Sequence, residues 1–332
     1  MILSVRDVEV AFPAGLWFSR RSIRAVAGVS FEIGAGETFA LVGESGSGKT
    51  TLARAINGLQ SIAGGEVRFD GRRIDRLSRA ASIPLRRQMA LMFQDPLGSL
   101  SPRMKVGDSV AEPFRVHGLK VNLREETMHL LSLVGLSADF AARYPHQLSG
   151  GQARRVGVAR AIALNPRLII ADEPTAGLDV SVQGEVLNLL NDLRERLGLA
   201  MLIITHNLPV VKHVADRMAV MYLGRIVESG DTRDLFRAPA HPYTAALLSA
   251  SPQPHPAQAR ERISLPAEVP SLLERPSGCE FHTRCPWSKP RCATDAPDAI
   301  YTDDAGGARR ALCHYPLASN ATVATATTGD TS

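Results

Sequence analysis

Long apolar runs are missing from this sequence. No stretch approaches the roughly 18 consecutive apolar residues that a membrane-spanning helix needs. The opening segment MILSVRDVEVAF lacks both the basic part and the long apolar part of a secretory signal. We therefore expect a protein that stays in the cytosol, where disulfides are rare, and that does not cross the membrane.

Blocks of like charge, internal repeats and heptad patterns are also missing. Lys and Arg total 38 against 33 Asp and Glu, and this formal charge of +5 is spread along the chain. The distribution does not indicate a nucleic-acid-binding arm, and it fits a modest attraction to an anionic membrane surface or an acidic partner. A length of 332 residues, 45% of them hydrophobic, is typical of a folded protein of about two domains.

Strand and helix patterns alternate in most of the chain. Residues 3–12 alternate in polarity, which predicts a half-buried edge strand, and Val29–Ile33 is a second strand candidate. Apolar residues recur at helical spacing from Val182 to Leu197. Three continuous apolar segments are typical of buried parallel strands: Phe39–Val42, Arg167–Ala171 and Ala200–Thr205. This order predicts an α/β fold with a parallel sheet.

Other regions differ in composition. Residues 96–155 show helical patterns and no clear buried strand, whereas frequent prolines interrupt the chain beyond residue 230. The small polar residues at the end are typical of a disordered tail. We predict a core of residues 1–95 and 156–230, a helical insert of residues 96–155, an extension of residues 231–317 and a disordered tail of residues 318–332.

A glycine-rich segment between a predicted strand and a predicted helix fits G-x-x-x-x-G-K-[ST], the pattern of a phosphate-binding P-loop. The backbone N–H groups of such a loop surround phosphates. Lys49 would reach the β- and γ-phosphates, and Thr50 would supply an oxygen to Mg²⁺. The predicted nucleotide-binding residues are Gly43, Glu44, Ser45, Gly46, Ser47, Gly48, Lys49, Thr50 and Thr51.

Two acids follow the apolar segment that begins at Leu168. Asp172 can hold Mg²⁺, and Glu173 can orient or deprotonate the attacking water. A strand followed by two acids would by itself indicate only a solvated strand end. Because the P-loop is also present, the pair predicts nucleotide hydrolysis.

A third motif, Leu148-Ser-Gly-Gly-Gln152, precedes a predicted helix over Ala153–Ala163. A serine and two glycines at a helix N-terminus form a second phosphate cradle. One chain needs one cradle for its own nucleotide, so the second implies a partner whose ATP it completes. Its residues are Ser149, Gly150, Gly151 and Gln152.

With these motifs, residues 1–230 resemble the ATP-binding cassette family. The resemblance implies a P-loop NTPase with a RecA-like core, an antiparallel β subdomain and an inserted helical subdomain. It implies that Gln94, in the Q-loop, senses Mg²⁺ and the γ-phosphate and contacts a membrane partner. Asp179 matches the D-loop, and His206 matches the switch histidine that contacts the γ-phosphate. Glu173, His206 and Gln94 are thus the predicted catalytic residues.

The sequence also offers candidates for the adenine contact, and it departs from the family pattern at two places. Phe12 corresponds to the aromatic residue that stacks on adenine, although it also fits a core position at a strand end, and Trp17 and Phe18 are rivals. The D-loop has Ala176-Gly177 where the family more often has Ser-Ala. After the third motif, Ala153-Arg154-Arg155 replaces a more usual Arg-Gln-Arg. Neither departure removes a catalytic group.

Several longer sequence segments resemble the ATPases of oligopeptide and dipeptide importers. The resemblance is in particular to the second, F-type member of the ATPase pair. The phrases are Gln94-Asp-Pro-Leu-Gly-Ser-Leu-Ser, Tyr144-Pro-His-Gln and His241-Pro-Tyr-Thr-Ala-Ala-Leu-Leu. The resemblance implies ATP and Mg²⁺, a homologous second ATPase, two permeases, an extracytoplasmic substrate-binding protein, and a peripheral place on the cytoplasmic face of the inner membrane. Related importers carry nickel, glutathione, opines or murein peptides. The alternative is a cassette ATPase that acts on nucleic acid or the ribosome; the absence of a coiled coil argues against it.

Four cysteines, Cys279, Cys285, Cys292 and Cys313, gather in the extension with C-x5-C-x6-C-x20-C spacing. The first interpretation is a [4Fe–4S] cluster, since four thiolates can hold one and Pro286 follows a cysteine; similar importer tails resemble proteins with such a cluster. The second is four buried free cysteines, and the third is zinc, although the usual C-x2–4-C knuckle is missing. A redox sensor that regulates import is a further hypothesis.

Overall fold

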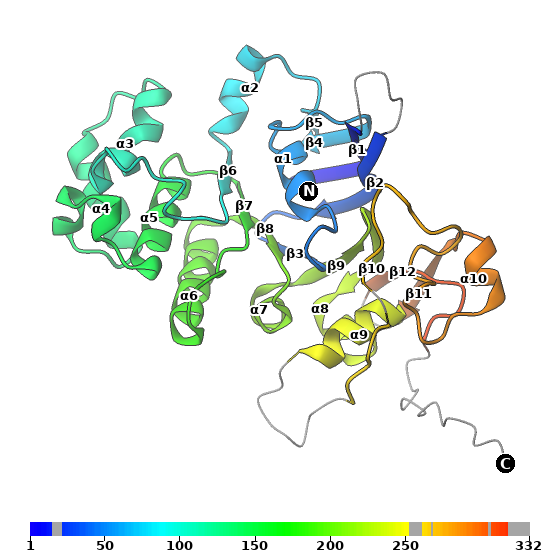
Figure 1. Cartoon of the computed structure of the whole chain (residues 1–332). Coiled ribbons are helices and arrows are strands. Elements are labelled where there is room, and N and C mark those ends of the chain that lie inside the picture. The colour runs from blue at the N-terminus through cyan, green and yellow to red at the C-terminus, as the bar shows by residue number, and fades with distance from the viewer. Residues whose placement is uncertain (15–21, 252–260, 267, 305–306, 318–332) are drawn as a thin grey trace. The chain divides into compact units, whose positions relative to one another are not determined.

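The computed structural model describes residues 1–14, 22–251, 261–266, 268–304 and 307–317. Contacts within the chain divide it into two units, Met1–Ile226 and Val227–Ser332, whose elements are labelled in Figure 1. This division lies four residues before the boundary predicted at residue 230. Trp17, Phe18 and the predicted tail of residues 318–332 lie outside the described residues.

The first unit contains an antiparallel sheet with the strand order β2-β1-β4-β5. Its strands are β1 (Leu3–Pro13), β2 (Ser22–Ile33), β4 (Gly64–Phe69) and β5 (Arg72–Arg73). The prediction that residues 3–12 form an edge strand is wrong, because β1 pairs with β2 on one side and with β4 on the other. Alternating polarity reports only that one face of a strand is buried, so it cannot distinguish an edge strand from an inner strand.

A second sheet has the order β9-β3-β8-β7-β6 in the first unit, and its neighbouring strands are parallel. The strands are β3 (Thr38–Val42), β6 (Met89–Met92), β7 (Leu168–Asp172), β8 (Ala200–Thr205) and β9 (Arg217–Tyr222). The helices that connect or flank them are α1 (Lys49–Ile56), α2 (Arg79–Arg86), α6 (Val180–Leu197) and α7 (Leu208–Val214). The predicted parallel α/β sheet is therefore confirmed.

Strand β7 is buried on both faces. Ile169 and Ala171 pack into one apolar cluster with the inserted helices, whereas Leu168 and Ile170 pack into another with α1 and the antiparallel sheet. Successive side chains of a strand point to opposite faces, so a strand between two cores must be apolar throughout. This double burial fixes the end of β7, where Asp172 and Glu173 lie.

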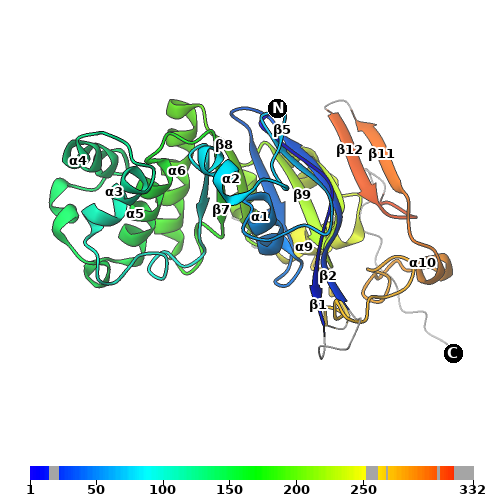
Figure 2. The same cartoon turned by 90° about the horizontal axis from the view of Figure 1, so that it is seen from above.

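Helices α3, α4 and α5 lie together to one side of the parallel sheet in both Figure 1 and Figure 2. The insert consists of α3 (Val106–Val116), α4 (Leu123–Leu133), two short 3₁₀ turns at Ala138–Ala142 and Pro145–Gln147, and α5 (Gly150–Ile162). Helix α5 begins three residues before the predicted Ala153. Its earlier start follows from Ser149, which caps the helix by accepting a hydrogen bond from the Gln152 N–H.

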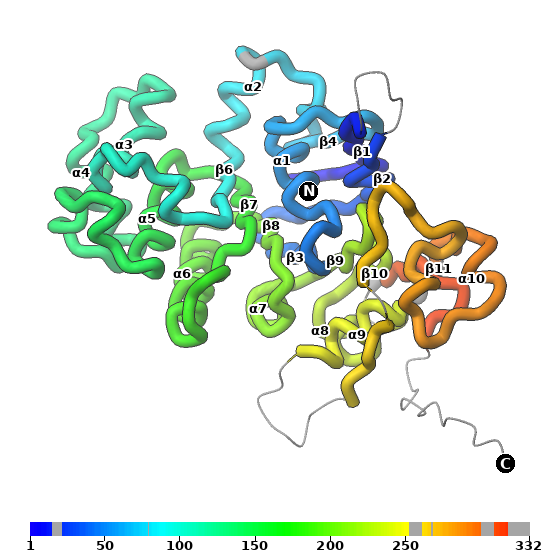
Figure 3. The backbone as a smooth tube through the Cα atoms, viewed as in Figure 1, coloured from blue at the N-terminus to red at the C-terminus, as the bar shows by residue number. Residues whose placement is uncertain are grey.

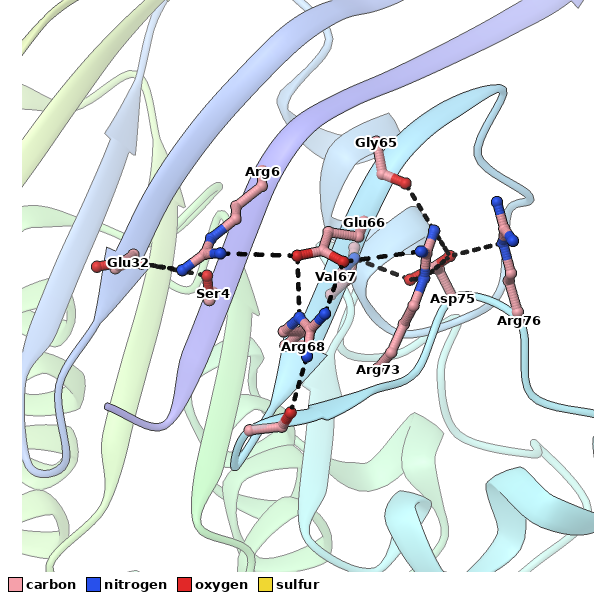
Figure 4. Close-up of polar contacts among 11 residues, drawn as sticks. Ser4, Arg6, Glu32, Gly65, Glu66, Val67, Arg68, Arg73, Asp75 and Arg76 are labelled. Atoms are coloured by element: carbon pink, nitrogen blue, oxygen red, sulfur yellow. Dashed lines mark hydrogen bonds and ion pairs between the residues drawn. The ribbon is translucent and has the colours of Figure 1, made fainter.

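Charged side chains cross the antiparallel sheet and connect its strands (Figure 4). Arg6 on β1 contacts Glu32 on β2 at 3.5 Å and Glu66 on β4 at 3.8 Å. Arg73 on β5 pairs with Asp75 at 3.0 Å, and the Asp75 side chain is only 1% exposed. Hydrogen bonding from Arg68 holds the pKa of Glu66 below its usual range. Exposed pairs contribute little singly, but this network supports the register of four strands.

The second unit contains β10 (Arg225–Asp231), whose first two residues belong to the first unit, with β12 (Gly307–Leu312) and β11 (Ala299–Asp304). Strand β12 lies between the other two and is antiparallel to both. The helices are α8 (Thr232–Arg237), α9 (Pro242–Ala250) and α10 (Pro290–Thr294), and the trace in Figure 3 follows the chain between them. Among the described residues, no helix combines the length and apolar character needed to cross a membrane.

A buried ion pair holds the second unit together. Arg309 on β12 contacts Glu228 on β10 at 2.6 Å, and neither side chain is more than 6% exposed. Glu228 also accepts hydrogen bonds from the backbone N–H groups of Ala240 and His241, before α9. His241 caps α9 by accepting from the Tyr243 N–H, and burial lowers the pKa of its ring to about 3. This imidazole therefore stays neutral at physiological pH.

Candidate functional site

The glycine-rich segment lies between β3 and α1, as predicted. Gly48 has φ +100°, and a Cβ atom there would lie 2.2 Å from the carbonyl oxygen of Ala25. A Cβ atom at Gly43 would lie 2.2 Å from the carbonyl oxygen of Met221. These two positions therefore require glycine, which lets the loop turn directly into the N-terminus of α1.

Lys49 is the first residue of α1, and its ammonium group lies within the loop. Its Nζ donates to the carbonyl oxygens of Gly43 at 2.7 Å and Glu44 at 2.8 Å, and to Ser47 Oγ at 3.2 Å. Burial lowers the pKa of Lys49, while the charges of Glu173, Asp172 and Glu44 oppose that shift. A cation with three donors is thus held inside the loop by two backbone carbonyl oxygens and one hydroxyl.

Asp172 ends β7 next to Thr50. Burial raises the pKa of its carboxyl group, and the hydrogen bond from Thr50 and the charges of Lys49 and Arg54 act in the opposite direction. Its Oδ1 atom is buried and has no hydrogen-bond partner. An oxygen without a partner beside a threonine hydroxyl fits the oxygen ligands that Mg²⁺ prefers, and such an ion would also offset the cost of burying the carboxylate.

Glu173, the next residue, has φ +50°, in the left-handed region that non-glycine residues seldom adopt. Its Oε1 lies 2.6 Å from Nδ1 of His206 and accepts from the His206 N–H, while Oε2 accepts from the Thr205 hydroxyl. These partners come from the end of β8. Because β7 and β8 are parallel neighbours, their carboxyl ends meet, and the predicted base and switch histidine are brought together.

Gln94 follows β6 and lines a cleft of about 560 Å³ together with Thr50, Asp95 and Asp172. The structure therefore brings this predicted residue to the two predicted Mg²⁺ ligands. The backbone oxygen of Gln94 accepts a hydrogen bond from Arg154 at 3.0 Å. Sequence reasoning missed this contact, because Arg154 lies 60 residues further along the chain.

The third motif lies at the start of α5. Ser149 and Gln152 cap the helix reciprocally, and Ser149 and Gly150 are exposed. Asp179 in the D-loop is also exposed and caps α6 by accepting from the Val182 N–H at 2.9 Å. Both motifs therefore cap a helix in this chain, and both also have residues exposed on its surface.

Phe12 near the end of β1 is partly buried and packs against the apolar cluster beneath the antiparallel sheet. This contact matches its interpretation as a core residue at a strand end. Its adenine contact stays a prediction, as does that of its rivals.

The four cysteines all belong to the second unit. Burial raises the pKa of Cys285 to about 12 and that of Cys313 to about 11, and the charges of the other thiols add to both shifts. The Cys279 N–H donates to the carbonyl oxygen of Cys292. Among the described residues, no three His, Cys, Asp or Glu side chains are arranged to hold a metal ion. Four thiols are a donor set that suits a metal centre, whereas in this structure all four are free cysteines.

Strand-end acids beside a P-loop on a parallel sheet define a P-loop nucleoside triphosphatase. Residues 26–176 match the family described as ABC transporter, and residues 227–292 match the family described as oligopeptide/dipeptide transporter, C-terminal region. The chain belongs to the ABC transporter family, with the C-terminal region of its oligopeptide/dipeptide branch, and it is an ATP-hydrolysing member. ATP and Mg²⁺ are the substrate and ion expected of it.

Named relatives cover nearly the whole chain. The putative oligopeptide transport ATP-binding protein YkfD of Bacillus subtilis is 46% identical over 89% of this chain and 91% of its own length. The di/tripeptide transport ATP-binding protein DppF of Pseudomonas aeruginosa is 42% identical over 95% and 97%. The dimeric ATP-binding cassette MJ0796, bound to ADP and Pi, is 29% identical with a TM-score of 0.64, over 70% of this chain and 99% of that one. The predicted fold class is thereby confirmed.

Proposed function

We propose that this chain hydrolyses ATP to drive the uptake of dipeptides or oligopeptides through membrane permeases. The main observation behind the proposal is that Thr50, Gln94 and Asp172 line the same cleft. The C-terminal match to peptide transporters supports the solute class. The alternative of an ATPase acting on nucleic acid or the ribosome finds no support in the relatives described above.

Each residue has a role that follows from its place. Lys49 and the loop N–H groups would bind the phosphates, and Thr50, Asp172 and Gln94 would hold Mg²⁺, which would neutralise phosphate charge. Glu173 accepts the proton of the attacking water, and its contact with His206 sets the direction of the carboxylate. His206 is exposed, so it can turn to the γ-phosphate when nucleotide is bound.

The exposed third motif points to a second cassette. In the proposal, Ser149–Gln152 of this chain complete the ATP site of a homologous ATPase, whose own motif completes the site at Lys49. The pair contacts two permeases at the cytoplasmic face of the inner membrane, as a peripheral assembly. A substrate-binding protein outside the membrane delivers the peptide. Phe12 is proposed to stack on adenine, and Asp179 to lie at the interface of the pair.

The uptake of a labelled dipeptide by cells tests this proposal. In a strain whose own copy of the gene is deleted, the wild-type chain should restore uptake, and Lys49→Ala should reduce it to the background of the deletion, because the phosphates lose their cation. Lys212→Ala, an exposed lysine on α7, is the matched control and should restore uptake fully. If the deletion leaves uptake of dipeptides and longer peptides unchanged, the proposed solute class is wrong.

For the cysteines we propose that Cys279, Cys285, Cys292 and Cys313 hold a [4Fe–4S] cluster that organises the second unit and takes no part in hydrolysis. All four cysteines lie in the second unit, and the charges of other thiols in the group contribute to the raised pKa values of Cys285 and Cys313. Both observations support this proposal. Thiols of raised pKa such as Cys279, Cys285 and Cys313 would lose their protons on binding iron, since the metal offsets the cost of the buried charge.

Anaerobic purification of the full chain tests the cluster. We expect iron and acid-labile sulfide in equal amounts with a visible absorption band, and a loss of both in Cys285→Ser/Cys292→Ser. Ser99→Ala, a change of similar size in the first unit, should keep the iron. Colourless protein without iron would support buried free cysteines, and zinc in place of iron would support the third interpretation.

A further inference from the structure

We propose that Arg154 is a positioning residue that links the Q-loop to the D-loop, and so links this chain's own nucleotide site to the surface it offers to a second cassette. The inference rests on the proposed function. The Arg154 side chain acts on these loops through hydrogen bonds to three backbone carbonyl groups.

The guanidinium of Arg154 joins two loops that are distant in sequence. One terminal nitrogen donates to the carbonyl of Phe93 at 3.2 Å, and the other donates to the carbonyls of Gln94 at 3.0 Å and Ala176 at 3.3 Å. Phe93 and Gln94 follow β6, and Ala176 opens the D-loop after β7. A planar group with donors in a fixed fork holds such acceptors at set positions relative to one another.

Burial makes this link costly to break. Arg154 is 1% exposed, and its Nε has no hydrogen-bond partner, so the cation depends on these carbonyls and on the charge of Asp95. A buried cation that loses its acceptors pays for desolvation without compensation. A shift of the Q-loop would therefore move the arginine and, with it, the D-loop.

The start of α5 packs on the D-loop and on the first turn of α6. A Cβ atom at Gly151 would lie 2.7 Å from Val182 Cγ1, and one at Gly150 would lie 3.4 Å from Leu178 Cδ2. Arg154 is one helical turn after Gly150 on α5. Three motifs thus move together. They are the Q-loop with Gln94, the phosphate cradle Ser149–Gln152 and the D-loop with Asp179 at the start of α6. Occupancy of this chain's site is thereby transmitted to the partner's site.

Steady-state ATPase kinetics of the complete transporter test the link. In Arg154→Met, which keeps the side chain's volume and removes its donors, we expect kcat to fall about tenfold while KM for ATP changes less than about twofold. The Hill coefficient should fall towards 1, because the two sites no longer communicate. Arg154→Lys, which keeps the charge, should restore part of both quantities.

Arg155→Met is the matched control. Arg155 lies next along α5 but donates to the carbonyl of Val134 and to Glu185, away from both loops, so its kcat and Hill coefficient should stay at wild-type values. Melting temperatures of both variants separate folding from coupling, and Arg154→Gln replaces Arg154→Met if the latter does not fold. Wild-type kinetics in the Arg154 variants, or an equal loss in Arg155→Met, would overturn the inference. If the wild-type complex itself hydrolyses no ATP, the proposed function fails instead.

Discussion

Glu173→Gln is expected to lower the rate of ATP hydrolysis by about 10²- to 10⁴-fold and to leave ATP binding intact. Glutamine has nearly the shape of glutamate, so the contacts with Thr205 and His206 can persist. An amide cannot accept a proton from the attacking water. Phosphate release at saturating ATP measures the rate, and equilibrium dialysis with labelled ATP measures binding.

The same variant should also trap an assembled state. In the proposed function ATP is bound between this chain and a homologous ATPase. Glu173→Gln mixed with that partner, ATP and Mg²⁺ should therefore elute as a complex of two cassettes in size-exclusion chromatography with light scattering. Glu195→Gln, an exposed glutamate on α6, is the matched control and should turn over at the wild-type rate. Unimpaired hydrolysis by Glu173→Gln would refute the role of Glu173 as the base.

Arg309→Met is expected to destabilise the second unit by about 3–5 kcal/mol, the usual cost of removing one partner from a buried ion pair. The variant leaves the carboxylate of Glu228 buried without its cation, and it also removes the hydrogen bond to the carbonyl of Ala238. Urea unfolding followed by the fluorescence of Trp287 in a Trp17→Phe background reports on this unit alone, since the chain has only these two tryptophans.

Two further variants test whether the loss of stability comes from the buried Arg309–Glu228 ion pair. Arg309→Met combined with Glu228→Gln removes both charges, and the glutamine oxygen can still accept a hydrogen bond from the backbone N–H groups of Ala240 and His241, so the double variant should recover part of the loss. Arg237→Met breaks the exposed pair with Asp234 and should cost no more than about 0.5 kcal/mol. Equal effects of Arg309→Met and Arg237→Met would contradict the importance of the buried pair. ATP binding in the first unit should be retained in all three.

The parallel sheet could be predicted from the sequence to a large extent. The run Ala200–Thr205 coincides with β8, because a strand with a core on each face must be apolar at every position and stops where polar residues begin. Strand β6 was not foreseen, because the short apolar run Met89–Met92 cannot be told from a buried helical segment by its pattern alone. The hairpin of β11 and β12 was not predicted, because its polar and apolar residues show no regular alternation. Strand β12 also pairs with β10, which is distant in sequence.

The candidate site was predictable where its chemistry follows from spacing along the chain. The P-loop and the acids at the end of β7 are of this kind. Thr205 and Arg154 were not predictable as partners, because each acts on a segment that only the fold brings near. The sequence shows Arg154 as part of a departure from the family pattern. Its hydrogen bonds to the carbonyls of Gln94 and Ala176 could not be predicted, because they depend on the packing of α5.

The strand order of the second unit has a consequence for synthesis of the protein. Strand β12 is made last of the three strands, yet it lies between β10 and β11. While the ribosome is still translating residues 232–306, β10 has no antiparallel partner in this unit, and Glu228 has no Arg309. The first unit can fold as it emerges, since domains fold in turn from the N-terminus. The second must wait for the last segment, so a premature stop before residue 307 would leave it without its central strand.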